Sequence, residues 1–195
     1  DASFIYFVDN QGPSGHFALQ RRSRDANEAD PSTMLIDYGT AVTSVEINAQ
    51  YPTVLFVIQR IPGSQDLLRE FSKSNGDFLA NLEVGPAGTM REIQYDGRYL
   101  YWLNGTTLRA DDTTNGAKKT VVASGVSAYF AEGFYQGQGC DPERGCDPDV
   151  AFVLYGKGNQ ILLDDAVSPG GGYPPYYTAT DPNATIHAIT RDNSD

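Results

Sequence analysis

Short apolar runs, separated by turn residues, are the dominant pattern along this chain. Four of these runs resemble one another and occupy residues 4–8, 54–58, 99–103 and 151–155. They are rich in aromatic and β-branched residues, or alternate with polar residues, and none keeps a helical period over about 11 residues. The pattern therefore predicts an all-β protein that is nearly free of helix.

A four-part unit recurs along the sequence. The apolar runs begin at residues 4, 54, 99 and 151, a spacing of roughly 50 residues that is typical of propeller blades. A second predicted strand, apolar at first and charged at its end, follows each run from residues 16, 66, 106 and 159. Third strands are predicted at residues 33–37, 78–83, 120–124 and 176–180, and fourth strands at residues 42–49, 90–97, 128–135 and 185–192.

Four strands repeated four times predict a four-bladed β-propeller of four-stranded antiparallel blades. We expect one domain over residues 1–195, with repeats at 1–41, 42–89, 90–126 and 127–184. Residues 185–192 would then pair with the N-terminal blade and close the ring, or complete the first blade of a neighbouring molecule. A β-sandwich or jelly roll is the alternative fold, because it also contains many short strands, but it does not predict the same four-part order.

The third repeat, residues 97–125, carries the sequence GRYLYWLNGTTLRADDTTNGAKKTVVASG. It resembles a blade of the YWTD-type propellers of lipoprotein-receptor ectodomains and of related bacterial secreted propellers. The shared features are the pair Tyr101-Trp102, Arg109 on the next strand and an apolar third strand before Gly125. Leu103-Asn104 replaces the family's Thr-Asp, so calcium binding through that Asp is not implied. The resemblance implies a propeller architecture and a binding role, and chain length favours four blades over the usual six.

Charge and hydropathy narrow the classes of partner. The 195 residues carry a formal net charge of −11, with a pI near 4.5. Such a field repels phosphate backbones and anionic lipid, so we expect no nucleic-acid partner. No apolar stretch approaches the roughly 18 residues of a membrane-spanning helix, so we expect no membrane insertion.

Two cysteines and two glycosylation sequons point to an extracellular location, either secreted or at the cell surface. Cys140 and Cys146 flank a short segment with turn residues, and a disulfide between them would require an oxidising compartment. A zinc site is less favoured, because neither a His nor a third Cys lies nearby. Asn104-Gly-Thr and Asn183-Ala-Thr are candidate glycosylation sites.

Acidic residues crowd the loop around the cysteines. Asp141, Glu143, Asp147 and Asp149 could supply oxygen ligands to calcium, but they lack the spacing of a preformed calcium loop. A solvated acidic loop is the simpler interpretation, so the sequence predicts no cofactor, with calcium as the alternative.

Candidate catalytic groups are few. His16 and His187 are the only histidines, and neither accompanies a nucleophile motif. The doublets Asp111-Asp112 and Asp164-Asp165 lie at similar places in two repeats. Adjacent strand residues point to opposite faces, so neither doublet forms a catalytic pair, and turn chemistry explains both. We therefore expect no enzyme activity; a hydrolase with a loop-built site is the remaining alternative.

The segment SPGGGYPPYY, residues 168–177, is the most unusual in composition. Its tyrosines lie among prolines and offer rigid amphipathic surface of the kind found in protein interfaces and sugar-binding sites. We therefore select Tyr173, Tyr176 and Tyr177, with the single tryptophan Trp102, as candidate binding residues. The predicted function is a non-enzymatic extracellular structural or interaction module that self-associates or binds a protein partner, with a glycan-binding lectin as the alternative.

Overall fold

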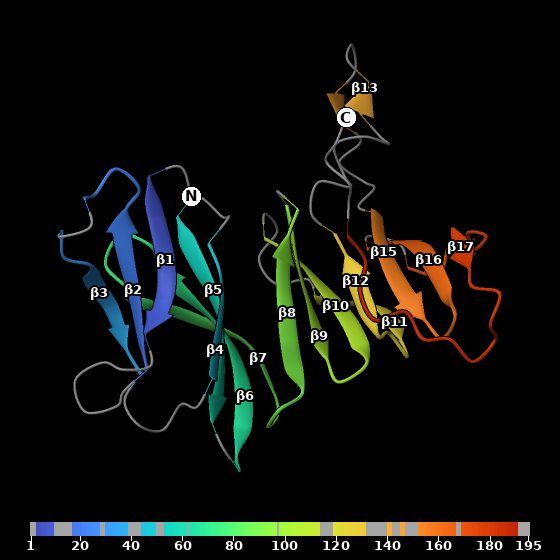
Figure 1. Cartoon of the computed structure of the whole chain (residues 1–195), viewed down its shortest axis with the longest axis horizontal. Coiled ribbons are helices and arrows are strands. Elements are labelled where there is room, and N and C mark those ends of the chain that lie inside the picture. Colours follow the sequence, from blue (N-terminus) through green and yellow to red (C-terminus); the bar gives the residue numbers. More distant parts are fainter. Residues whose placement is uncertain are drawn as a thin grey trace. The chain divides into compact units, whose positions relative to one another are not determined.

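The chain folds into four small antiparallel β-sheets (Figure 1). The computed structural model describes residues 3–9, 17–27, 30–38, 44–49, 53–61, 63–96, 98–113, 119–131, 140–141, 145–146, 152–166 and 169–190. Two compact units divide the chain, Asp1–Ile93 and Gln94–Asp195, and strand β8 spans the point of division.

The first unit contains two sheets. The first sheet has three strands among the described residues, in the order β1 (Phe4–Asp9), β2 (Ala18–Ser23) and β3 (Thr33–Asp37). The second sheet has four strands, in the order β4 (Ser44–Asn48), β5 (Val54–Ile61), β6 (Gln65–Ser72) and β7 (Phe78–Pro86). In both sheets the spatial order of the strands follows the chain.

The third and fourth sheets repeat this order. The third sheet contains β8 (Met90–Tyr95), β9 (Tyr99–Asn104), β10 (Thr107–Asp112) and β11 (Lys119–Ser124). The fourth sheet contains β12 (Ala128–Phe130), β15 (Phe152–Lys157), β16 (Gln160–Asp165) and β17 (Tyr177–Thr178). A two-stranded hairpin, β13 (Cys140–Asp141) and β14 (Gly145–Cys146), is inserted between β12 and β15.

Equivalent hairpins in the third and fourth sheets use the same turn. Asn104 pairs with Thr107, and Lys157 pairs with Gln160, so each connection has two residues. Gly105 (φ 62°) and Gly158 (φ 57°) hold the first loop position in the left-handed region. Two-residue hairpins favour such turns because their twist matches that of the strands, and glycine adopts them without strain.

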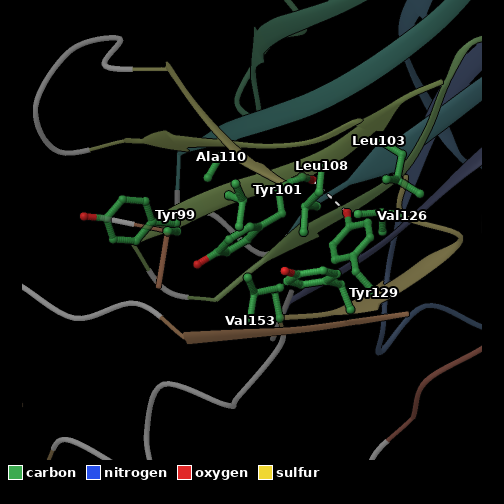
Figure 2. Close-up of a cluster of buried hydrophobic side chains, with 12 residues drawn as sticks. Tyr99, Tyr101, Leu103, Leu108, Ala110, Val126, Tyr129 and Val153 are labelled. Carbon is green, nitrogen blue, oxygen red and sulfur yellow. Dashed lines mark hydrogen bonds between the residues drawn. The ribbon is translucent and has the colours of Figure 1, made fainter. Parts of the chain in front are cut away.

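Each unit has an apolar core between its sheets. In the first unit, Leu19 of β2 packs with Leu55 and Val57 of β5 and with Phe71 of β6. The core of the second unit is built around tyrosines of the third and fourth sheets (Figure 2). Its labelled members are Tyr99, Tyr101, Leu103, Leu108, Ala110, Val126, Tyr129 and Val153.

The all-β prediction and the repeated strand order are confirmed, and the strands of each sheet fall within one predicted repeat. The strand expected at residues 185–192 is not formed over its described part, since residues 185–190 have no strand structure. The Ile186 N–H instead donates to the Gly158 carbonyl (3.1 Å), in the turn between β15 and β16. Pairing of this segment with β1 is thus not among the strand pairings of the described residues.

Candidate functional site

The tyrosines selected from the sequence lie on the surface of the second unit. Tyr173, Tyr176 and Tyr177 have exposed fractions of 42%, 70% and 52%. They flank Pro174 and Pro175, which are also exposed. Large exposed aromatic side chains of this kind are candidates for contact with a partner.

Local contacts hold two of these tyrosines in place. The Tyr176 N–H donates to the Ile161 carbonyl (2.9 Å), and Tyr177 begins β17, where it pairs with Ile161. The Tyr173 ring packs edge-on against Phe152, with the ring centroids 5.7 Å apart. The proline-flanked segment is therefore anchored to the fourth sheet while its aromatic surface faces solvent.

Trp102 does not belong to this surface. Its side chain is completely buried in β9, between Tyr101 and Leu103, which are equally buried. Residues 99–103 are apolar at every position, which is typical of a strand covered on both faces. The structure therefore contradicts Trp102 as a residue that contacts a ligand, and it assigns Trp102 to the core.

The aspartate doublets lie at the ends of two strands, where the sequence predicted turn chemistry, and their side chains are buried. Asp111, Asp112, Asp164 and Asp165 close β10 and β16, with exposed fractions of 4–7%. Asp112 forms an ion pair with Arg98 (2.8 Å), and Asp164 accepts the Gly170 N–H (3.0 Å). These carboxylates hold the ends of strands and the loops beside them, so they serve the fold.

A further carboxylate joins the tyrosine core. Asp96 accepts the N–H groups of Arg98 (2.8 Å) and Tyr99 (2.6 Å) and the hydroxyl of Tyr101 (2.9 Å). The Tyr129 hydroxyl donates in turn to the Tyr101 carbonyl (3.0 Å). Burial raises the pKa of Asp96, and burial together with the Asp96 charge raises the pKa of Tyr101. These hydrogen bonds join groups within the fold, which indicates a structural role.

The first sheet presents a different feature, an exposed apolar face. Ile5 and Phe7 of β1 have exposed fractions of 53% and 37%. Tyr6 and Val8, which alternate with them along the strand, pack against the core. A groove of about 320 Å³ runs between β1 and β4, lined by Phe4, Ile5, Tyr6, Arg24, Ile47 and Ala49. Sequence reasoning missed this surface, although the continuous apolar run at residues 4–8 predicts a strand that needs cover on both faces.

Several predicted site residues lie outside the described residues. They are His16, Glu143, Asp147 and Asp149 entirely, and Cys140, Asp141 and Cys146 in their side chains. The calcium site thus stays a prediction. Cys140 and Cys146 lie directly opposite one another in the antiparallel hairpin. The Cα atoms of such a pair are close enough for a disulfide. The disulfide stays a prediction, and the backbone geometry is compatible with it.

The remaining candidates lie on the surface or at its edge. Asn104 is half-buried at the end of β9, and Asn183 and His187 are exposed. Among the residues that the structure describes, no cluster of three His, Cys, Asp or Glu could hold a metal ion. That part of the chain also contains no helix of the length and hydropathy needed to cross a membrane.

Comparisons with known proteins do not extend this description. No family model and no curated protein matches the chain. Two exposed surfaces of the described residues are candidates for contact with a partner, the tyrosine segment of the fourth sheet and the apolar face of β1.

Proposed function

We propose that this chain is a non-enzymatic extracellular interaction module, a four-bladed β-propeller in architecture, that associates with copies of itself through its first sheet. The observation that carries the proposal is the exposed apolar face of β1. Ile5 and Phe7 are exposed in a strand whose counterparts in the other three sheets are covered on both faces. Exposed apolar surface on a strand of this kind favours contact with a partner.

Composition supports the extracellular and non-enzymatic parts of the proposal. The direct pairing of Cys140 with Cys146 suits a disulfide, which persists in oxidising compartments. Hydrogen bonds and an ion pair join the buried carboxylates Asp66, Asp96 and Asp112 to other groups of the fold. A module with this interior would act through its surface.

Native mass tests the proposed self-association. We expect the purified, non-reduced chain to give, by light scattering, a mass that rises with concentration above the 21.2 kDa of one chain. Negative-stain imaging would then show whether the assemblies are closed rings or fibres. A constant single-chain mass up to high concentration would contradict self-association.

A glycan-binding lectin is the second candidate function, favoured by the exposed tyrosines. Tyr173, Tyr176 and Tyr177 offer aromatic faces on which sugar rings can stack. A glycan array probed with the native chain would reveal such binding, and Tyr176→Ala should abolish it while Val121→Ala, an exposed residue of β11, should not. An array without signal would remove this candidate.

A further inference from the structure

The connection between β16 and β17 carries a continuous exposed stretch of prolines and tyrosines. Every residue from 170 to 178 is exposed, and Tyr176, at 70%, has the highest exposed fraction among the exposed large apolar side chains in the described part of the chain. Residues 166–180 contain no Asp, Glu, Lys, Arg or His. Tyrosine enrichment without charge is typical of the centre of a protein interface. The composition of this stretch therefore suits contact with another protein.

Two consecutive prolines restrict the backbone of the Pro-Tyr segment, defined here as residues 173–177. A proline ring fixes φ at about −65° and pushes the residue before it to extended conformations. Pro174 and Pro175 thus restrict Tyr173 as well as themselves. The structure has no helix, strand or turn over residues 169–175, and β17 begins only at Tyr177. These constraints favour polyproline II, a stiff left-handed helix without internal hydrogen bonds, over residues 173–175.

Contacts on both sides of the prolines hold this segment against the fourth sheet. Before the prolines, the Gly170 N–H donates to the Asp164 carboxylate (3.0 Å). The Tyr173 ring covers Gly171, where a Cβ would lie 2.8 Å from the Cε2 atom of Tyr173. After the prolines, the Tyr176 N–H donates to β16, and β17 pairs with the same strand. The prolines are therefore presented from a fixed base, which lowers the entropy cost of binding a partner.

The prolines also determine how a partner can recognise the segment. Pro174 and Pro175 have no backbone N–H, so they offer carbonyl acceptors and ring surface but cannot donate to the ladder of an added strand. Proteins bind polyproline II segments in grooves lined with aromatic side chains. The indole N–H and phenol O–H groups of such a groove can donate to the proline carbonyls. The chemistry of the segment thus specifies an aromatic groove in the partner.

A sugar matches the same surface less well. Tyrosine rings can stack on sugar faces, but the hydroxyl groups of a sugar also need polar side chains that fix its orientation. Residues 166–180 include no carboxylate or amide side chain for this purpose. For this segment, a protein partner is therefore favoured over a glycan.

We propose that the Pro-Tyr segment is the ligand of a protein partner whose aromatic-lined groove receives polyproline II segments. Pro174 and Pro175 enter the groove, Tyr176 and Tyr177 extend the contact beside it, and Tyr173 positions the segment on the fourth sheet. The inference goes beyond the proposed self-association and does not rest on it, because the segment belongs to the second unit and β1 to the first.

A panel of isolated proline-binding domains of the SH3, WW and EVH1 types tests this proposal, because such domains bind polyproline II ligands in aromatic grooves. They serve as probes of groove chemistry. We expect isothermal titration with the full-length native chain to detect binding to at least one domain. Changing both prolines, Pro174→Ala with Pro175→Ala, should weaken this binding about tenfold or more. Pro182→Ala changes an exposed proline outside the segment and, as the matched control, should bind like the native chain.

Further variants separate this proposal from the others. Tyr176→Ala should also weaken binding about tenfold, and Phe7→Lys should bind like the native chain, so a failure of self-association leaves this result intact. Binding to no domain of the panel, or binding that the double proline variant leaves unchanged, would overturn the proposal. A glycan-array signal lost in Tyr176→Ala would in that case assign the surface to a sugar. Circular dichroism melts of all variants exclude misfolding as the cause of lost binding.

Discussion

Asp66 shows how one buried carboxylate organises a loop in the first unit. It is completely buried, and its oxygens accept the N–H groups of Gly88 (3.0 Å) and Met90 (2.9 Å), while Arg60 forms an ion pair with it (3.3 Å). Burial raises the pKa of Asp66, but these hydrogen bonds and the Arg60 charge outweigh it, so the pKa lies below 3.8. The charged form is thus the one that the fold stabilises.

Substitution of Asp66 should lower the stability of the protein and should also make that stability less sensitive to acid. Because the folded pKa is lower than the unfolded one, the carboxylate stabilises the fold above pH 3.8, and this contribution is lost as the pH falls through the folded pKa. We expect Asp66→Asn to lower the free energy of unfolding by roughly 1–3 kcal/mol at neutral pH. Urea titrations of both proteins between neutral and acid pH measure this, and an equal acid-induced loss in both would contradict it.

The Tyr101 hydroxyl tests the buried network of the second unit. Tyr101→Phe removes the 2.9 Å hydrogen bond to Asp96 without changing the shape of the ring. The carboxylate keeps its two backbone donors but loses a buried partner, so we expect a loss of roughly 1–3 kcal/mol. Tyr173→Phe, at an exposed position, serves as control and should change stability by less than about 0.5 kcal/mol. Equal effects of the two changes in thermal melts would show that the Asp96 contact adds nothing.

At the scale of elements, the turn between β6 and β7 depends on a close approach of two backbones. Gly76 has φ 78°, and a Cβ there would lie 2.2 Å from the Leu35 carbonyl oxygen. Gly88, after β7, has φ 82° but meets nothing within 4 Å. We expect Gly88→Ala to cost roughly 1–2 kcal/mol from the left-handed backbone alone. Gly76→Ala should lower the free energy of unfolding by roughly 1–3 kcal/mol more than Gly88→Ala does, because β3 must move to make room for the new Cβ.

This matched pair isolates steric contact from backbone strain. Denaturant midpoints of the two variants, measured with the native chain, give the difference directly. Similar losses in both would mean that the contact between Gly76 and Leu35 is relaxed at little cost.

Strand positions could be predicted from the sequence because the signal is local. The third strand of the first repeat, predicted at residues 33–37, is β3 with the same bounds, and β9 and β15 follow their apolar runs closely. Turn glycines at 105 and 158 mark both hairpins. Periodicity and turn chemistry act over a few residues, so one sequence is enough to read them.

Features that depend on distant partners could not be read in this way. Residues 185–190 alternate like a strand, but a strand forms only where another edge receives it, and in the described structure Ile186 bonds to the turn at Gly158. Trp102 suggested a binding residue by its type, although the unbroken apolar run around it already indicated burial on both faces. Exposure of Ile5 and Phe7 depends on what covers β1 in the folded protein, and no residue of β1 encodes that.

At the scale of the whole molecule, net charge should govern how readily copies meet. Each chain carries a formal net charge of −11, so two copies repel one another at long range, while the proposed contact through Ile5 and Phe7 is apolar. The Debye length falls from about 30 Å at 0.01 M salt to about 8 Å at 0.15 M, which screens the long-range repulsion but does not weaken an apolar contact. We therefore expect association to tighten over this range, as measured by light scattering at fixed protein concentration. Phe7→Lys, which places a charge on the apolar face, should keep single-chain mass throughout, and weaker association of the native chain at higher salt would mean that attraction between charges at the contact outweighs the repulsion.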